Sequence, residues 1–251
     1  MTSAAAAPPN RAYQRLSVEE RRTQLLGAAL TLFAHRAPDE VSLDEVAAAA
    51  GVSRPLVYRY FPGGRQQLYE AALRSAADEL ELCFTEPPVG PPTERVARVL
   101  GRYLAFVDEH DTGFSALLRG GSVAETSRTT AIVDEVRRAA AEQILLHLGR
   151  GGTQAPGPRL RMMVRTWIAA VEAASLIWLD EEKQPPADDL RAWLVDQLIT
   201  LLAATAATDR ETASVVAELL PLETADGPAG RLAARLVPVV AEAAHLLPPP
   251  D

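Results

Sequence analysis

Two short helical segments on either side of a single glycine restrict the fold of this chain more than any other feature. Ser42 and Glu45 have the spacing of a capping box, which predicts that a helix begins here and runs over 43–50. Gly51 ends that helix, and a second helix over 53–61 follows at once. Two short helices joined by a glycine-containing turn are typical of a helix-turn-helix.

The rest of the chain also has helical periodicity, and no stretch alternates apolar with polar residues over the length of a strand. Ala and Leu dominate the apolar 48% of the residues, and both favour helix. The sequence therefore predicts an all-α protein. The predicted helices lie at 17–37, 43–50, 53–61, 65–84, 93–109, 114–118, 126–148, 159–179, 188–206, 209–220 and 231–247. Pro238 is expected to kink the last of these helices.

Charge is distributed unevenly between the two parts of the chain. Residues 1–77 contain nine Arg and seven acidic side chains, a balance of +2, whereas residues 78–251 have a balance of −10. A basic head on an acidic body favours contact with DNA at one end only. We predict a disordered arm over 1–16, a DNA-binding domain over 17–77 and a helical regulatory and dimerisation domain over 78–251.

Several classes of site and location are disfavoured. Cys83 is the single cysteine, and the four histidines do not have metal-ligand spacing, so no metal site is expected. No charge-free apolar run of about 18 residues predicts a membrane span, and the first residues lack the apolar core of a signal peptide. We find no nucleophile–base pair and no phosphate-binding loop. We therefore expect a cytoplasmic protein with no catalytic residues and no cofactor.

The second short helix contains side chains that suit DNA. The N-terminal residues of such a helix reach base edges in the major groove, and hydroxyl and guanidinium groups can bind phosphates. Tyr58 and Tyr60 could also be ordinary core aromatics. The surrounding motif favours the DNA role for both.

The segments 41–53 and 57–61 resemble the DNA-binding domain of the TetR family, and the likeness extends over about 17–77. The resemblance implies a helical ligand-binding body and a homodimer on a palindromic operator. It also implies repression that a small molecule releases, although some members of the family activate transcription. The alternative, an all-helical carrier of hydrophobic ligands or an enzyme, would not bind DNA.

Family roles can be transferred to the matching positions. Arg54 and Pro55 occupy the groove-facing start of the recognition helix, and Leu56 stands where the family often has Thr. The fourth helix departs from the family pattern, because Gly63-Gly64 precedes Arg65 and makes the turn one residue longer. The resemblance implies DNA contacts from Ser42, Ser53, Arg54, Pro55, Leu56, Tyr58, Arg59, Tyr60 and Arg65.

A mainly apolar ligand pocket is expected in the body. Glu172, in a very apolar helix, either reaches solvent or faces this pocket as a polar handle. Few polar handles imply a small, largely hydrophobic effector with one or two polar groups. The candidate pocket residues are Phe84, Tyr103, Phe106, His110, Phe114, Leu117, Trp167 and Glu172.

Because the last two long helices form the dimer interface in the family that this chain resembles, two apolar stripes in the body are interpreted as a dimer seam rather than as a pocket wall or helix-packing core. They occur in the predicted helices 159–179 and 188–206, and four such helices could bury a shared core. The stripes are Val164, Trp167, Val171 and Trp178, and Leu190, Leu194, Leu198 and Leu201. The tail beyond Asp209 is rich in Val and Leu, so we expect it to pack on the body.

Overall fold

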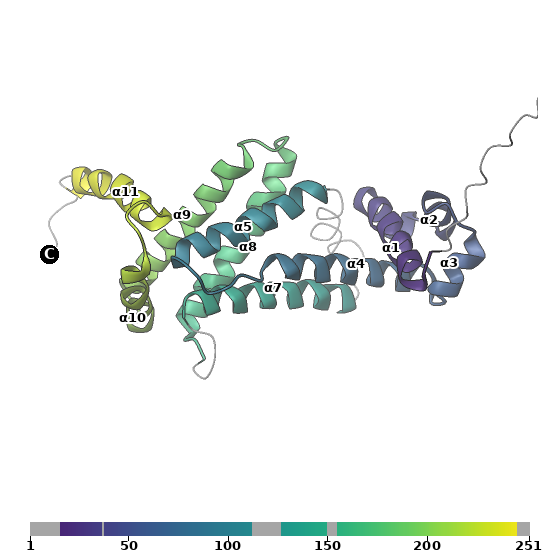
Figure 1. Ribbon diagram of the computed structural model, residues 1–251, viewed down its shortest axis with the longest axis horizontal. Coiled ribbons are helices and arrows are strands. Elements are labelled where there is room, and N and C mark those ends of the chain that lie inside the picture. The colour runs from purple at the N-terminus through teal and green to yellow at the C-terminus, as the bar shows by residue number, and fades with distance from the viewer. Residues whose placement is uncertain (1–15, 37, 112–126, 150–154, 245–251) are drawn as a thin grey trace, which may run out of the picture.

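A computed structural model describes residues 16–36, 38–111, 127–149 and 155–244, and these residues form helices and no strand. The all-α prediction is therefore confirmed. Most of the predicted arm and the predicted helix 114–118 lie outside the described residues. A small helical head occupies one end of the molecule, and α10 and α11 occupy the other (Figure 1).

The head consists of three helices and a short 3-10 turn in front of a long fourth helix. The two predicted capping boxes are both present. The Ser17 hydroxyl accepts from the backbone N–H of Glu20, and the Ser42 hydroxyl accepts from that of Glu45. Local hydrogen bonding therefore determines where two of the helices begin. The elements are α1 (Val18–His35), η1 (Pro38–Glu40), α2 (Leu43–Ala49) and α3 (Arg54–Tyr60).

Two glycines permit the sharp turns of the head. Gly51 has φ of +64°, which lets the chain turn between α2 and α3. Gly64 has φ of +72° and begins α4 (Gly64–Cys83), one residue earlier than predicted. The longer turn that the sequence suggested is thus accommodated by the left-handed conformation of Gly64.

Helix α4 connects the head to the body. It packs on α1, where the rings of Phe33 and Tyr69 meet edge to face, and also on α7 (Ser127–His147) and α5 (Pro92–Glu109). It continues without a break across the predicted domain boundary at 77. Movement of α4 relative to the body would therefore move the head.

A buried carboxylate holds the linker between α4 and α5. The side chain of Glu86 is 5% exposed, and its oxygens lie 2.6 Å from Nε of Arg98 and 2.8 Å from a terminal nitrogen of Arg102. Both arginines also donate to linker carbonyls, including those of Thr85 and Val89. Burial acts to raise the pKa of Glu86, but these two hydrogen bonds outweigh it and hold the pKa below its usual value.

We expect Glu86→Ala to lower the free energy of unfolding by about 1 kcal/mol, because it removes the shared partner of two arginines whose side chains, 45% and 40% exposed, can turn to water. Glu86→Gln is the matched control. It should lower the free energy of unfolding by less, since the amide oxygen still accepts a hydrogen bond. Urea unfolding at neutral pH measures both. The contribution should disappear as the pH falls through the lowered pKa, since the carboxylate is then protonated in both states. An Ala variant with unchanged stability would contradict this role of Glu86.

The body consists of α5, α7, α8 (Pro158–Asp180) and α9 (Ala187–Ala206). Helix α8 packs between α7 and α9, and α5 packs on α9. The apolar stripes predicted as a dimer seam lie mostly inside a single protomer. Val164, Trp167, Val171, Trp178, Leu190, Leu194 and Leu198 are all buried there, and Leu201 is half-buried. The correction has a simple cause: helical periodicity identifies an apolar face but not the partner of that face.

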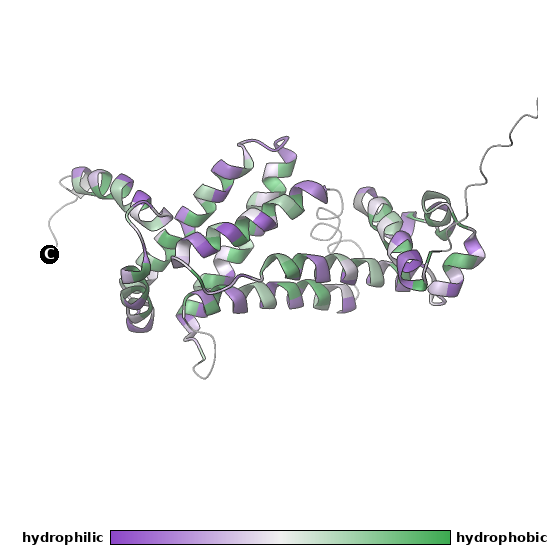
Figure 2. Cartoon of the chain, in the orientation of Figure 1, coloured by the Kyte–Doolittle hydropathy of each residue, from purple (hydrophilic) through white to green (hydrophobic). Residues whose placement is uncertain are grey.

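Helix α8 is long and apolar enough, by length and composition alone, to cross a membrane. Figure 2 shows hydrophobic residues over much of its length. The helix contains Arg165 and Glu172, and its inner face packs on α7 and α9. Core helices of globular proteins pass the same test, and we interpret α8 as one of them.

The tail packs on the body through its first turns, as predicted. Helix α10 (Arg210–Leu219) lies on α9 and α8, with Val215 fully buried, and η3 (Leu220–Leu222) follows. Helix α11 (Pro228–Ala244) packs on α9 and α5, where Arg235 pairs with Asp196 at 2.6 Å.

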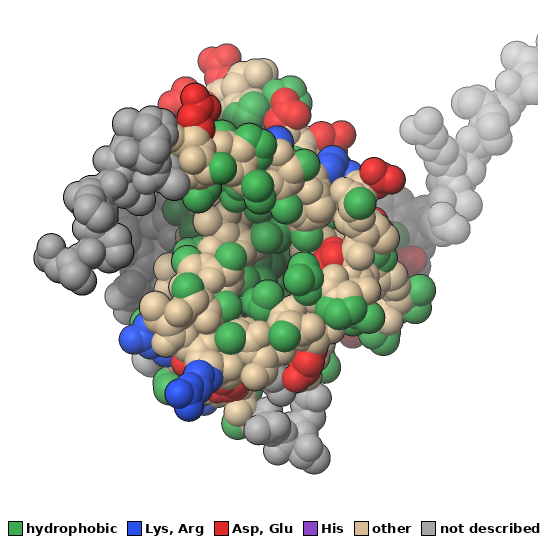
Figure 3. Space-filling view, turned by 90° about the vertical axis from the view of Figure 1, so that its left-hand side faces the viewer, with side chains coloured by type: hydrophobic (Ala, Val, Ile, Leu, Met, Phe, Trp, Pro, Cys, Tyr) green, Lys and Arg blue, Asp and Glu red, His purple; other side chains and the backbone are tan. Residues whose placement is uncertain are grey.

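The outer part of the tail departs from that prediction. Leu236, Val239 and Val240 are 40%, 61% and 63% exposed, and Leu220 is 65% exposed. Figure 3 looks onto this end of the molecule and shows hydrophobic side chains gathered around a hollow. The sequence predicted that the tail is anchored but not which of its faces is covered.

Candidate functional site

Helix α3 presents its polar residues to solvent. Val57 is its buried contact with the core, whereas Arg54, Pro55, Tyr58 and Arg59 are exposed. The Pro55 ring lies in the first turn, where a missing N–H is not needed. This helix therefore has the exposed N-terminal end that major-groove recognition requires.

Arg54 is held in place by two neighbours. One of its terminal nitrogens lies 2.9 Å from a carboxylate oxygen of Asp44, and the other lies 3.4 Å from the Tyr58 hydroxyl. Its guanidinium carbon also lies 5.5 Å from the centre of the Tyr58 ring. The hydrogen bond with Tyr58 and the charge of Asp44 raise the pKa of Arg54. Asp44 therefore orients Arg54 and also places a negative charge where DNA would approach.

A groove about 740 Å³ in volume, its open mouth included, joins this cluster to residues of α2 and α4. Ser42, Arg54, Tyr58 and Arg65 all line it. The Ser42 hydroxyl lies 2.7 Å from the carboxylate of Glu45, and Arg65 donates to the Asp39 carbonyl at 2.7 Å. Four of the nine predicted DNA contacts thus surround one groove, and phosphate would have to replace some of these internal partners.

The other predicted contacts lie elsewhere on α3. Ser53 is the N-cap residue of the helix, but its exposed side chain makes no capping hydrogen bond. Arg59 lies over the ring of Tyr60 at 5.6 Å, while Leu56 and Tyr60 are half-buried. Tyr60 packs against the core of the head, so its ring has a structural role whatever its hydroxyl binds.

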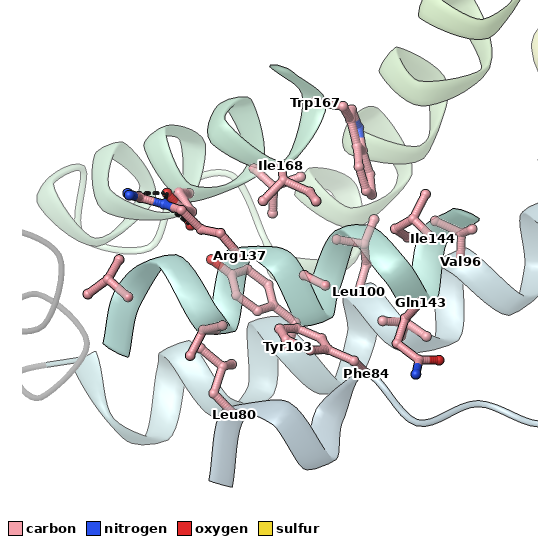
Figure 4. Close-up of a pocket in the computed structure, with 16 residues that line it drawn as sticks. Leu80, Phe84, Val96, Leu100, Tyr103, Arg137, Gln143, Ile144, Trp167 and Ile168 are labelled. Carbon is pink, nitrogen blue, oxygen red and sulfur yellow. Dashed lines mark hydrogen bonds and ion pairs between the residues drawn. The ribbon is translucent and has the colours of Figure 1, made fainter. Parts of the chain in front are cut away.

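The body contains an apolar pocket between α4, α5, α7 and α8 (Figure 4). It encloses about 710 Å³ of space not filled by atoms, its open mouth included. The indole N–H of Trp167 donates to the Leu194 carbonyl at 3.0 Å, which fixes the ring as part of the wall. Burial raises the pKa of the Tyr103 hydroxyl, so this phenol stays neutral at physiological pH.

An ion pair between two described lining residues lies at one end of the pocket. Nε of Arg137, on α7, lies 3.1 Å from both carboxylate oxygens of Glu172, on α8, and a terminal nitrogen of Arg137 lies 2.9 Å from one of them. Figure 4 shows this pair beside the pocket, near the Tyr103 hydroxyl. The pair joins two helices that enclose the pocket.

The structure brings half of the predicted pocket residues together. Phe84, Tyr103, Trp167 and Glu172 all line the pocket. Phe114 and Leu117 lie outside the described residues.

Phe106 and His110 do not line the pocket, contrary to the prediction. Their rings stack with centres 4.5 Å apart in the last turn of α5. His110 lies 3.9 Å from Glu79 of α4 and accordingly faces that helix, past the end of the pocket.

Sequence reasoning missed the α7 wall. Val133, Val136, Ala140 and Ile144 recur at helical spacing on one face of α7, and Arg137 interrupts that face. A charged residue within an apolar stripe was the available signal. Among the described residues, no three His, Cys, Asp or Glu side chains come together as a possible metal site.

Two family models match this chain. Residues 25–72 match "Bacterial regulatory proteins, tetR family", and residues 92–201 match "Tetracyclin repressor-like, C-terminal domain". The first match covers most of the head, from within α1, and the first part of α4. The second covers α5 to most of α9, so α10 and α11 lie beyond it.

Individual proteins give the same result. The HTH-type transcriptional activator FasR of Mycolicibacterium smegmatis is 30% identical over 178 residues, which cover 69% of this chain and 79% of that protein. A tetR-family transcriptional regulator from Streptomyces coelicolor is 50% identical, with a TM-score of 0.80 over 90% of this chain and all of that one. A TetR-like regulator from Rhodococcus is 25% identical, with a TM-score of 0.60 over 75% of this chain and 99% of that one.

Proposed function

The chain belongs to the TetR family of transcriptional regulators, and on that basis we propose that it is a ligand-responsive repressor that binds a palindromic operator as a homodimer. It acts in the cytoplasm and has no catalytic function of its own. The observation that carries the proposal is the exposed cluster of Arg54, Tyr58, Ser42 and Arg65 around one groove of the head.

DNA binding follows from the chemistry of that cluster. Two guanidinium groups and two hydroxyls can bind phosphates and base edges, and they lie beside the N-terminal end of α3. The negative charge of the body keeps DNA contact at this end of the molecule.

The outward faces of α8 and α9 are the proposed dimer interface. Met162, Ile177 and Trp193 are 67%, 60% and 52% exposed on these two helices. Thr166, Ala169 and further small residues lie exposed between them, so close packing of a second copy is possible. A dimer of this kind places two α3 helices for half-sites about 34–36 Å apart, or a multiple of that distance.

Ligand binding can influence the head through α7. This helix lines the pocket and is ion-paired to α4 twice, by Glu135 to Arg74 and by Arg128 to Glu70 at 3.2 Å. Helix α4 in turn supports the head. A ligand that moves α7 therefore alters the position of the head, provided that it prefers one arrangement over the other.

The test is binding to the DNA upstream of the protein's own gene, by mobility shift. We expect the logarithm of the binding constant to fall linearly with log[salt], with a slope of about −0.9 for each phosphate contacted. A protein that ignores this DNA and other operator-length duplexes would be a carrier or an enzyme instead. In a reporter strain, deletion of the gene should raise transcription; lower transcription would assign activation, the role named for FasR.

A further inference from the structure

The ion pair of the pocket is asymmetric in its access to water. The side chain of Arg137 is 46% exposed, whereas that of Glu172 is 18% exposed. Arg137 also has a second carboxylate partner, Asp134, at 3.5 Å on its own helix. Among the described residues, Glu172 makes its ion pair with Arg137 alone.

The cost of breaking the pair therefore differs between its two members. If Arg137 leaves, its guanidinium moves toward water and Asp134. If Glu172 loses Arg137, a mostly buried carboxylate has no counter-charge, and such a loss is strongly unfavourable. A ligand that enters this end of the pocket can therefore replace Arg137 far more readily than it can replace Glu172.

We propose that the pocket takes an apolar ligand with one cationic group, which pairs with Glu172 in place of Arg137. The proposal deepens the proposed function, because it names the class of effector. The ring of Tyr103, which lies near the ion pair, adds a surface that attracts a cation (Figure 4). The acidic body, at −10, favours the approach of a cation over that of an anion.

Three probes with the same ten-carbon chain test the charge preference: decyltrimethylammonium and decanoate, each below its micelle concentration, and decanol, below its solubility limit. Calorimetry on the full-length protein should show at least tenfold tighter binding of the cation than of decanoate, a difference of about 1.4 kcal/mol. Equal affinities, tighter binding of decanoate, or no binding of the cation would overturn the proposal.

Variants locate the contact. Glu172→Gln should weaken the binding of the cation about tenfold and leave that of decanol unchanged. Arg137→Gln should leave the affinity for the cation unchanged or raise it, because it removes the guanidinium that competes with the cation for Glu172. Glu172→Asp, which retains the charge, should recover part of the affinity and excludes misfolding as the cause. Loss of decanoate binding in Arg137→Gln, with no effect of Glu172→Gln on cation binding, would assign the site to anions.

The proposed function can fail independently. Operator binding is measured separately by mobility shift, without any probe. A protein that binds the cation through Glu172 but binds no DNA would refute the regulator and leave the ligand class standing. A protein that binds its operator but prefers decanoate would refute the cationic ligand and leave the regulator standing.

Discussion

An Arg54→Ala variant should bind its operator about ten- to a hundredfold more weakly than the native chain, because a well-oriented arginine contributes about 1–3 kcal/mol of discrimination at a base pair. Asp44 and Tyr58 already hold the guanidinium at the exposed start of α3. The loss should be largest at one base position, since a base contact rather than a phosphate contact is removed. Mobility shifts against the upstream region and its single-base variants measure both effects.

Two companion variants separate base reading from charge. Tyr60→Phe retains the half-buried ring and removes only the hydroxyl. It should therefore weaken binding to all DNA sequences evenly, as expected for the loss of a phosphate contact. Asp44→Asn removes a negative charge and frees Arg54, so it should strengthen binding to every sequence and reduce the preference for the operator. Native affinity and selectivity in an Arg54→Ala, Tyr60→Phe double variant would contradict the assignment of α3.

Ile177→Glu combined with Trp193→Glu should convert the dimer to a monomer at micromolar concentration. Both side chains are more than half exposed in the protomer, so the substitutions should leave its fold intact. Four carboxylates per dimer would then be buried at the interface without partners. Operator affinity should fall about a hundredfold or more, because a monomer loses the effective concentration of the second head.

Sedimentation equilibrium measures the loss of the dimer, and circular dichroism checks that the fold is intact. Mobility shift measures the fall in operator affinity. Leu146→Glu is the matched control, since Leu146 is 50% exposed on α7 and does not belong to the proposed interface. It should remain dimeric and bind the operator normally. A native chain that sediments as a monomer, or a double variant that stays dimeric, would exclude α8 and α9 as the interface.

The sequence alone determined the helical class, the helix-turn-helix and the family. Each rests on signals that act over a few residues: the capping boxes at Ser17 and Ser42, the glycine at position 51 and the run 41–61. Helix bounds followed within a few residues for the same reason, because caps and breakers act locally. The mainly apolar pocket and the position of Glu172 on its wall also agree with the sequence prediction.

Only the tertiary structure decided which side chains meet. It placed the Trp167 stripe inside the protomer, Phe106 and His110 beyond the pocket, and Arg137 against Glu172. The contacts of Glu86 with Arg98 and of Asp44 with Arg54 likewise join residues ten or more positions apart. Periodicity shows that a helix has an apolar face, but burial depends on which other helix covers that face, and this is a property of the packed chain.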